Sequence, residues 1–79
     1  MKKVNKILSN ILQIDEDQIS DETSPDNVET WDSFNHLMII SEIENQLEIK
    51  FTMDEVRQIK NVGDITAILN IHGVKLIKE

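Results

Sequence analysis

The sequence predicts an all-α domain built as a small four-helix bundle. Hydrophobic residues make up 39% of the chain, but only Trp31, Phe34 and Phe51 are aromatic, and this aliphatic composition favours helices over sheets. The length of 79 residues fits one domain, and a chain of this size buries only about 60% of the surface that its unfolded form exposes. We therefore expect a single domain over residues 1–79 that is too small for a deep catalytic cleft and is not an enzyme.

The first helix is expected over residues 2–13. Apolar residues recur there at i, i+3, i+4 and i+7, and polar residues fill the positions between them. These apolar residues are Val4, Ile7, Leu8 and Ile11. One face of this helix is therefore expected to belong to the core.

A long loop is expected over residues 15–30, where no helical period persists. Pro25 favours an extended or turn conformation in its middle. Three apolar residues can pin the loop to the core: Ile14, Ile19 and Val28. The acidic start of the loop resembles a calcium loop, but Ile19 and Ser20 occupy positions that require a ligand and a glycine. We therefore expect no metal site.

The second helix is expected to begin with Ser33, as N-cap or as first residue, and to run to about Glu48. Its inward positions follow a helical spacing, and further apolar residues make this apolar face broader. A broad apolar face suits a central helix with several neighbours. The inward set is Phe34, Leu37, Ile40, Ile43 and Leu47, widened by Met38 and Ile39.

Two shorter helices complete the predicted bundle. Thr52 and Glu55 have the spacing of a capping box, which predicts a short helix over residues 53–59. Asn61 can cap a fourth helix, and Gly73 is a plausible stop because glycine tolerates the left-handed conformation that ends helices. The inward residues are Val56 and Ile59 in the third helix and Val62, Ile65, Ile68 and Leu69 in the fourth.

The charge balance excludes several classes of partner. Eight Lys and Arg against fifteen Asp and Glu give a net charge of −7, which repels nucleic-acid phosphates and anionic lipid headgroups and favours basic protein surfaces. No apolar run is long enough for a membrane span or continuous enough for a signal peptide, and the chain has no cysteine. We expect a cytoplasmic monomer that forms no disulfide, binds no nucleic acid and makes no stable membrane association.

The most informative residue is Ser33, at the junction between the polar loop and the apolar second helix. A serine hydroxyl there lies at the positive end of the helix, where unpaired backbone N–H groups favour a phosphate ester by about 0.3–1 kcal/mol. Serine is also a common N-cap. The position alone leaves both interpretations open.

Asp32-Ser33-Phe34, with an acidic loop before it and an apolar helix with several glutamates after it, resembles the acyl carrier proteins and their peptidyl and aminoacyl relatives. In that family an Asp-Ser-Leu motif opens the second helix of a four-helix bundle. Its serine carries 4′-phosphopantetheine, whose thiol holds acyl groups as thioesters. The resemblance implies that Ser33 is the attachment residue, that Asp32 is the acid of the motif, and that the protein is a carrier. The cofactor supplies the thiol, so the lack of cysteine is no obstacle.

The resemblance also implies partners. These are a phosphopantetheinyl transferase, an acyl-loading ligase or acyltransferase, and downstream enzymes that use the acyl group. Their docking surface would be the second helix, whose acids attract Lys and Arg in weak, salt-sensitive encounters. This predicted partner face consists of Phe34, Leu37, Met38, Ser41, Glu42, Glu44, Asn45 and Glu48.

The class of cargo stays open. Phe34 replaces the commoner leucine of the motif, as in D-alanyl carriers, and as an apolar residue it is expected to anchor the helix start in the core. Met38, Ser41 and Asn45 weaken an assignment to primary fatty acid synthesis, and the run WDSFNHL looks like free-standing carriers of specialised pathways. The alternatives are a fatty acyl, polyketide or specialised acyl carrier, and an aminoacyl or peptidyl (including D-alanyl) carrier. From another class, a small acidic protein-interaction module without a prosthetic group remains.

Three ring side chains near helix ends are assigned structural roles. Trp31 is expected to pack its ring over the junction of loop and helix. His36, one turn into the second helix, is expected to be partly exposed near the prosthetic arm and has no nucleophile partner for catalysis. His72 is expected to act at the end of the fourth helix as a favourable charge or as a polar cap.

Overall fold

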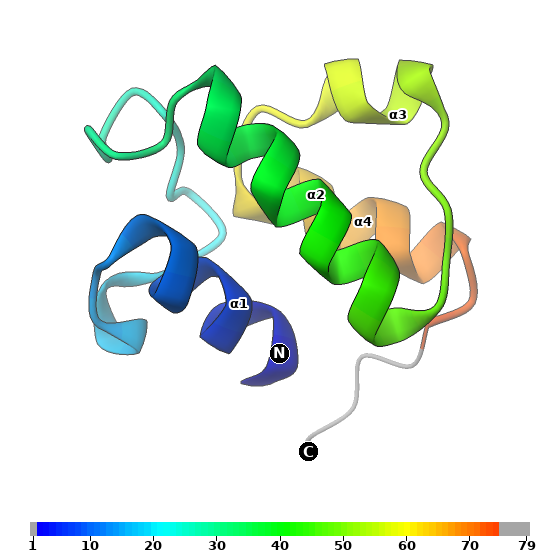
Figure 1. Ribbon diagram of the computed structural model, residues 1–79, viewed down its shortest axis with the longest axis horizontal. Coiled ribbons are helices and arrows are strands. Elements are labelled where there is room, and N and C mark those ends of the chain that lie inside the picture. The colour runs from blue at the N-terminus through cyan, green and yellow to red at the C-terminus, as the bar shows by residue number, and fades with distance from the viewer. Residues whose placement is uncertain (1, 75–79) are drawn as a thin grey trace.

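Four α-helices and one turn of 3-10 helix make up residues 2–74, the part of the chain that the computed structural model describes (Figure 1). In chain order these are α1 (Lys2–Leu12), η1 (Glu16–Gln18), α2 (Ser33–Leu47), α3 (Met53–Gln58) and α4 (Val62–Ile71). Residues 2–74 contain no strand. The all-α class is confirmed, with four helices that begin and end close to their predicted bounds. Among the described helices, none combines the length and the apolar character that a membrane crossing requires.

The core lies between α1, α2 and α4. In Figure 1, α2 runs through the middle of the molecule, with α1 to one side and α4 behind it. The buried side chains form a single cluster, to which the loop before α2 adds Trp31 and the end of α3 adds Ile59. Its members are Val4, Ile7, Leu8, Leu12, Trp31, Ile39, Ile40, Ile43, Ile59, Val62, Ile65, Ile68 and Leu69. The inward stripe predicted for the fourth helix is thus confirmed, and that of the first is confirmed except that Ile11 is only half-buried.

The residues of α2 that face the core differ from the sequence prediction near the start of the helix. Phe34 and Leu37 are predicted to face the core, but Phe34 is 70% exposed and Leu37 61% exposed. The buried face of α2 consists of Ile39, Ile40 and Ile43. Because Phe34 and Ile43 are about two and a half turns apart, they point to opposite sides of the helix. The prediction that Phe34 anchors the helix start in the core is therefore wrong.

The connection from α1 to α2 is long and is fixed at several points. It contains η1, which the sequence does not predict. The backbone N–H of Asp15 donates to Oε1 of Gln18 across this short turn at 3.3 Å. The residues predicted to pin the loop, Ile14, Ile19 and Val28, do pack against the core. Near its end, Oγ1 of Thr30 donates to the carbonyl of Leu12 at 2.7 Å and ties the loop to the end of α1.

The same loop is bonded to the first turn of α4. The backbone N–H groups of Val62 and Gly63 donate to the carbonyls of Thr23 and Asp21, both at 2.9 Å. Asn61 caps the helix through its side-chain oxygen, as predicted. The N–H groups that a helix start leaves unpaired are thus satisfied by the loop and the cap.

The start of α3 is joined to the end of α4. The predicted capping box is confirmed: Thr52 Oγ1 accepts the N–H of Glu55 at 3.1 Å, and Glu55 Oε1 accepts the N–H of Thr52 at 2.9 Å. His72 is the C-cap residue of α4, and its Nε2 lies 3.0 Å from both carboxylate oxygens of Glu55. The backbone N–H of Thr52, followed by the His72 ring, holds the pKa of Glu55 below its ordinary value of 4.5.

Candidate functional site

Ser33 is the first residue of α2, and Asp32 is its N-cap. Oδ1 of Asp32 accepts the backbone N–H of Asn35 at 2.8 Å. Ser33 itself is exposed, and its hydroxyl makes no hydrogen bond with any residue from 2 to 74. Of the two predicted places for this serine, N-cap or first residue, the structure shows the second. The hydroxyl is therefore available to an enzyme that approaches from solvent.

The electrostatic surroundings of Ser33 are mixed. The backbone N–H groups of Ser33 and Phe34 have no acceptor among the described residues, so the positive end of α2 remains open to an anion. The Asp32 carboxylate, one residue earlier, opposes an anion. A phosphodiester on Ser33 would gain only about 0.3–1 kcal/mol from the helix end. This arrangement suits a covalently attached phosphate better than the binding of a free one.

A line of hydrogen bonds joins three segments behind Ser33. Trp31 is buried in the loop, and its Nε1–H donates to Nδ1 of His36 at 3.1 Å. Because Nδ1 accepts this bond, the proton of the neutral ring belongs on Nε2, which donates to the carbonyl of Val56 in α3 at 3.3 Å. Both nitrogens of His36 are thus occupied. The ring links α2 to the loop and to α3 and offers no free group for acid or base chemistry.

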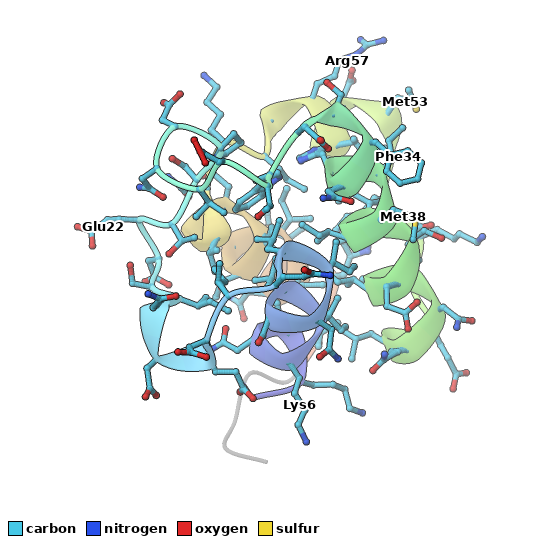
Figure 2. The ribbon with its side chains drawn as sticks, turned by 60° about the vertical axis from the view of Figure 1, so that its left-hand side comes forward. Lys6, Glu22, Phe34, Met38, Met53 and Arg57 are labelled. Carbon is cyan, nitrogen blue, oxygen red and sulfur yellow. The ribbon has the colours of Figure 1, made fainter. Side chains whose placement is uncertain are left out.

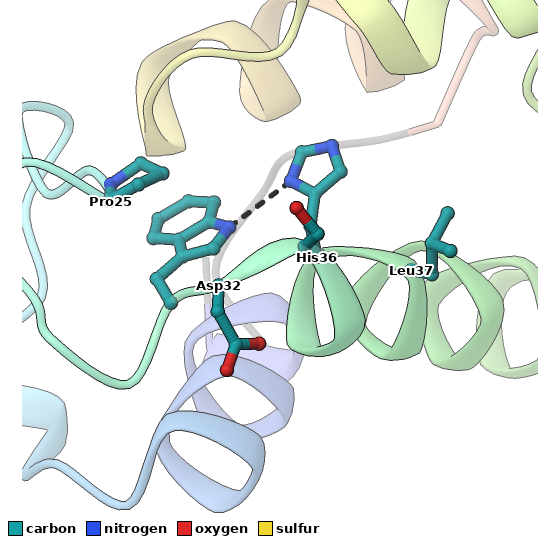
Figure 3. Close-up of a pocket in the computed structure, with 6 residues that line it drawn as sticks. Pro25, Asp32, His36 and Leu37 are labelled. Atoms are coloured by element: carbon teal, nitrogen blue, oxygen red, sulfur yellow. Dashed lines mark hydrogen bonds between the residues drawn. The ribbon is translucent and has the colours of Figure 1, made fainter.

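Ser33 also lies at the rim of a depression of about 520 Å³ between the loop and α2 (Figure 3). Its lining residues are Pro25, Trp31, Asp32, Ser33, His36 and Leu37. Figure 3 shows Pro25 at one end and Leu37 at the other, with the Asp32 carboxylate pointing away from the bond between Trp31 and His36. The sequence indicates a turn at Pro25 but gives no signal that it approaches Ser33, because this proximity depends on how the loop folds back.

The predicted partner face has an apolar part next to Ser33. Phe34, Leu37 and Met38 are all exposed on α2. Met53, the first residue of α3, is also exposed and lies on the same side of the molecule as Phe34 and Met38 (Figure 2). Sequence reasoning missed Met53. Its exposure could have been predicted, because Met53 is an apolar residue in the first turn of a capped helix and does not belong to the inward pair Val56 and Ile59.

The polar part of the predicted partner face lies further along α2. Ser41, Glu42, Glu44, Asn45 and Glu48 line one shallow depression together with Lys50. Oε2 of Glu44 accepts the backbone N–H of Phe51 at 2.8 Å, and Oε2 of Glu42 accepts a side-chain N–H of Gln46 at 2.8 Å. Glu44 therefore helps to hold the connection between α2 and α3. Glu48 is exposed, and its side chain has no hydrogen bond or ion pair within residues 2–74.

These features define a class of protein. It is a small helical bundle with an exposed serine at the start of its central helix, and the side chain of this serine does not cap the helix. A family model described as "Phosphopantetheine attachment site" matches residues 2–69. The chain belongs to this family. It is therefore a phosphopantetheine carrier and not an enzyme.

The fold has a counterpart among solved structures. A candidate acyl carrier protein, Rv0033, from Mycobacterium tuberculosis is similar with a TM-score of 0.80 and 22% sequence identity, over 90% of this chain and 95% of that chain. At this level of identity the likeness establishes the fold alone. The comparison with curated proteins gives no significant match.

Proposed function

We propose that Ser33 carries the 4′-phosphopantetheine arm and that the protein shuttles acyl groups held as thioesters on the thiol of this arm. In the loading step, catalysed by a phosphopantetheinyl transferase, the Ser33 oxygen loses its proton and bonds to phosphorus of coenzyme A, and adenosine 3′,5′-bisphosphate leaves. The observation that carries the proposal is the exposed Ser33 hydroxyl, left free by the Asp32 cap, in a chain that belongs to the phosphopantetheine family.

The proposed cargo is an acyl group of a fatty acid, polyketide or specialised pathway. A specialised pathway is favoured because the outer face of α2 combines few acids with exposed apolar side chains. An aminoacyl cargo, such as D-alanine, is the second candidate, because the Asp-Ser-Phe motif resembles carriers of that kind as well. In either case the loading enzyme selects the cargo.

The proposed partners are the transferase, the loading ligase or acyltransferase, and the enzymes that use the acyl group. We place their docking surface on the predicted partner face of α2. Phe34, Leu37 and Met38 would supply apolar contact beside Ser33, and the acids would attract basic residues of the partner. The protein would act as a monomer in the cytoplasm, where coenzyme A is available.

Intact-mass measurement tests the attachment. The purified protein is incubated with coenzyme A and a broad-specificity phosphopantetheinyl transferase, with a known carrier as positive control. We expect the mass of one arm on the wild type and on Ser41→Ala, a matched variant in the same helix, and no addition on Ser33→Ala. An unmodified wild type beside a modified positive control would favour the interaction module, and a modified Ser33→Ala would overturn the assignment of Ser33.

A further inference from the structure

We propose that the depression beside Ser33 is a resting site for the first segment of the phosphopantetheine arm, the segment that bears two methyl groups. The inference rests on the proposed attachment to Ser33. It places the resting arm on the loop side of α2, over Trp31 and against Pro25 and Leu37, rather than on the face that carries Phe34, Met38 and Met53.

The position of the depression fits an occupant tethered to Ser33. Ser33 is itself one of the lining residues, so anything esterified to its oxygen starts at the rim. The volume of about 520 Å³ falls within the range of about 300–1,000 Å³ that is typical of small-molecule sites. The dimethyl carbon of the arm is separated from the phosphate by one oxygen and one methylene. This segment therefore reaches the depression without any extension of the arm.

The chemistry of the lining selects an apolar segment. The indole N–H of Trp31 is used by His36, and both ring nitrogens of His36 are used by Trp31 and Val56. No buried side-chain nitrogen or oxygen among the described residues lacks a partner. The Trp31 and His36 rings thus have no spare donor or acceptor, and Pro25 and Leu37 add apolar surface; the other polar members of the lining are Asp32 and Ser33. The methyl groups fit the apolar part of this lining, whereas the two amides of the arm are better solvated in water.

Charge orients the tethered phosphate at the same place. The Asp32 carboxylate lies at the rim and points away from the Trp31 ring (Figure 3). Repulsion from this carboxylate keeps the phosphate on its solvent side, while the open N–H groups at the start of α2 attract it. The apolar segment that follows is then directed along Trp31 towards Leu37. An arm at rest there leaves Phe34, Met38 and Met53 uncovered for partner enzymes.

Proton NMR of the holo protein tests the proposal directly. Trp31 is the single tryptophan of the chain, so its indole signals are unambiguous. We expect nuclear Overhauser effects between the methyl protons of the arm and the indole ring of Trp31, and a shift of the indole N–H resonance between the apo and holo forms. Effects that reach only Met53 or Phe34, or an unchanged Trp31 indole, would overturn the resting site.

Two variants separate the depression from the neighbouring apolar surface at the start of α3. Leu37→Ala removes one wall of the depression, and Met53→Ala is the matched control on that neighbouring surface; both residues are largely exposed, so the fold is expected to persist. Because Leu37 also belongs to the predicted partner face, both variants are first loaded to completion, as intact mass shows. Most of the apo-to-holo shift at Trp31 should then be lost in Leu37→Ala and kept in Met53→Ala. Equal shifts in both would contradict the resting site, whereas a wild type without the arm would overturn the proposed function itself.

Discussion

At the scale of single residues, Asp32 caps α2 and Ser33 carries the proposed chemistry, so the two roles fall on different residues. The extended backbone of Asp32, with φ −105° and ψ −176°, places its carboxylate over the N–H of Asn35, and the helix proper begins one residue later. Ser33 can then be modified without loss of a bond that holds α2. The sequence predicts this junction, but the division of roles between the two residues depends on the backbone geometry.

This division predicts unequal effects of two alanine substitutions on stability. Ser33→Ala should change the free energy of unfolding by less than about 0.5 kcal/mol, as for other exposed surface positions. Asp32→Ala removes the cap of α2 and should lower it by about 1 kcal/mol. Urea denaturation of both variants measures the difference. A loss in Ser33→Ala as large as that in Asp32→Ala would show that the serine is the cap.

Local signals are predictable from the sequence, and the side of a helix that faces the core is less so. The caps at Thr52 and Asn61 are confirmed because each depends on a few neighbouring residues. Phe34 and Leu37 are misplaced because α2 is apolar over most of its circumference, so the sequence allows more than one inward face. Packing decides between them, and it buries Ile43 and its neighbours. The bond between Trp31 and His36 has no sequence signal at all.

At the scale of elements, the loop between α1 and α2 and the first turn of α4 support each other. Gly63 lies where they meet. A Cβ at this position would be 3.2 Å from Oδ1 of Asn61 and 3.3 Å from the carbonyl oxygen of Asp21. The first atom caps α4 and the second accepts the N–H of Gly63, so neither can move away without weakening a bond.

We therefore expect Gly63→Ala to destabilise the protein, although alanine is the better helix former. The expected loss is about 1–3 kcal/mol from overpacking. Ala67→Gly, at an exposed position of the same helix, should cost about 1 kcal/mol through helix propensity alone. Thermal and urea unfolding of the pair measure both values. A more stable Gly63→Ala would show that the loop does not press against α4.

The short helix α3 is held at two points. The ring of His36 bonds to the carbonyl of Val56 on one side, and Glu55 joins the start of α3 to His72 on the other. The sequence predicts the capping box that contains Glu55 but not the contact with His72, because that contact joins residues 17 positions apart. The nearness of Pro25 to Ser33 cannot be predicted from the sequence for a similar reason, because it arises only when the loop folds back towards α2.

The contact at Glu55 predicts a pH dependence of stability. Because its pKa is lower in the folded protein than its ordinary value of 4.5, ionised Glu55 stabilises the fold above that value, and this contribution is lost as the pH falls through the lowered pKa. Glu55→Gln should therefore be less stable than the wild type at pH 7, with a gap that closes in acid. The measurement is the urea midpoint of both proteins as a function of pH.

Asp54→Asn is a suitable control for this pH series. Asp54 lies in the same turn of α3, and its ion pair with Arg57 is almost fully in solvent. Exposed pairs of this kind contribute little to stability. A gap for Asp54→Asn as large as that for Glu55→Gln would mean that the charge of α3, and not the bonds of Glu55 with Thr52 and His72, produces the effect.

At the scale of the whole molecule, the net charge of −7 is available to attract basic partners. Only part of this negative charge lies on the proposed docking surface. Glu48 lies on the predicted partner face and is unbonded among the described residues, whereas Glu22 belongs to the loop on the opposite side from Phe34 and Met38 (Figure 2). These two glutamates therefore allow total charge to be separated from local docking.

We predict that Glu48→Lys lowers kcat/KM of the phosphopantetheinyl transferase several-fold and that Glu22→Lys, with the same net charge, lowers it much less. Higher salt should slow loading of the wild type and narrow the difference between the variants, since the Debye length falls from about 10 Å at 0.1 M to about 3 Å at 1 M. Initial rates at several salt concentrations provide the measurement. Equal effects of the two variants would argue against docking on α2.

The most direct test of the central claim is to locate the arm on the protein as its own cells produce it. The chain has five serines, Ser9, Ser20, Ser24, Ser33 and Ser41, and all lie in the tryptic peptide of residues 7–50. Fragmentation of this peptide in a mass spectrometer must therefore place the modification. We predict a single phosphopantetheine, bare or acylated, on Ser33. A peptide without the arm, or an arm on another serine, would contradict the account.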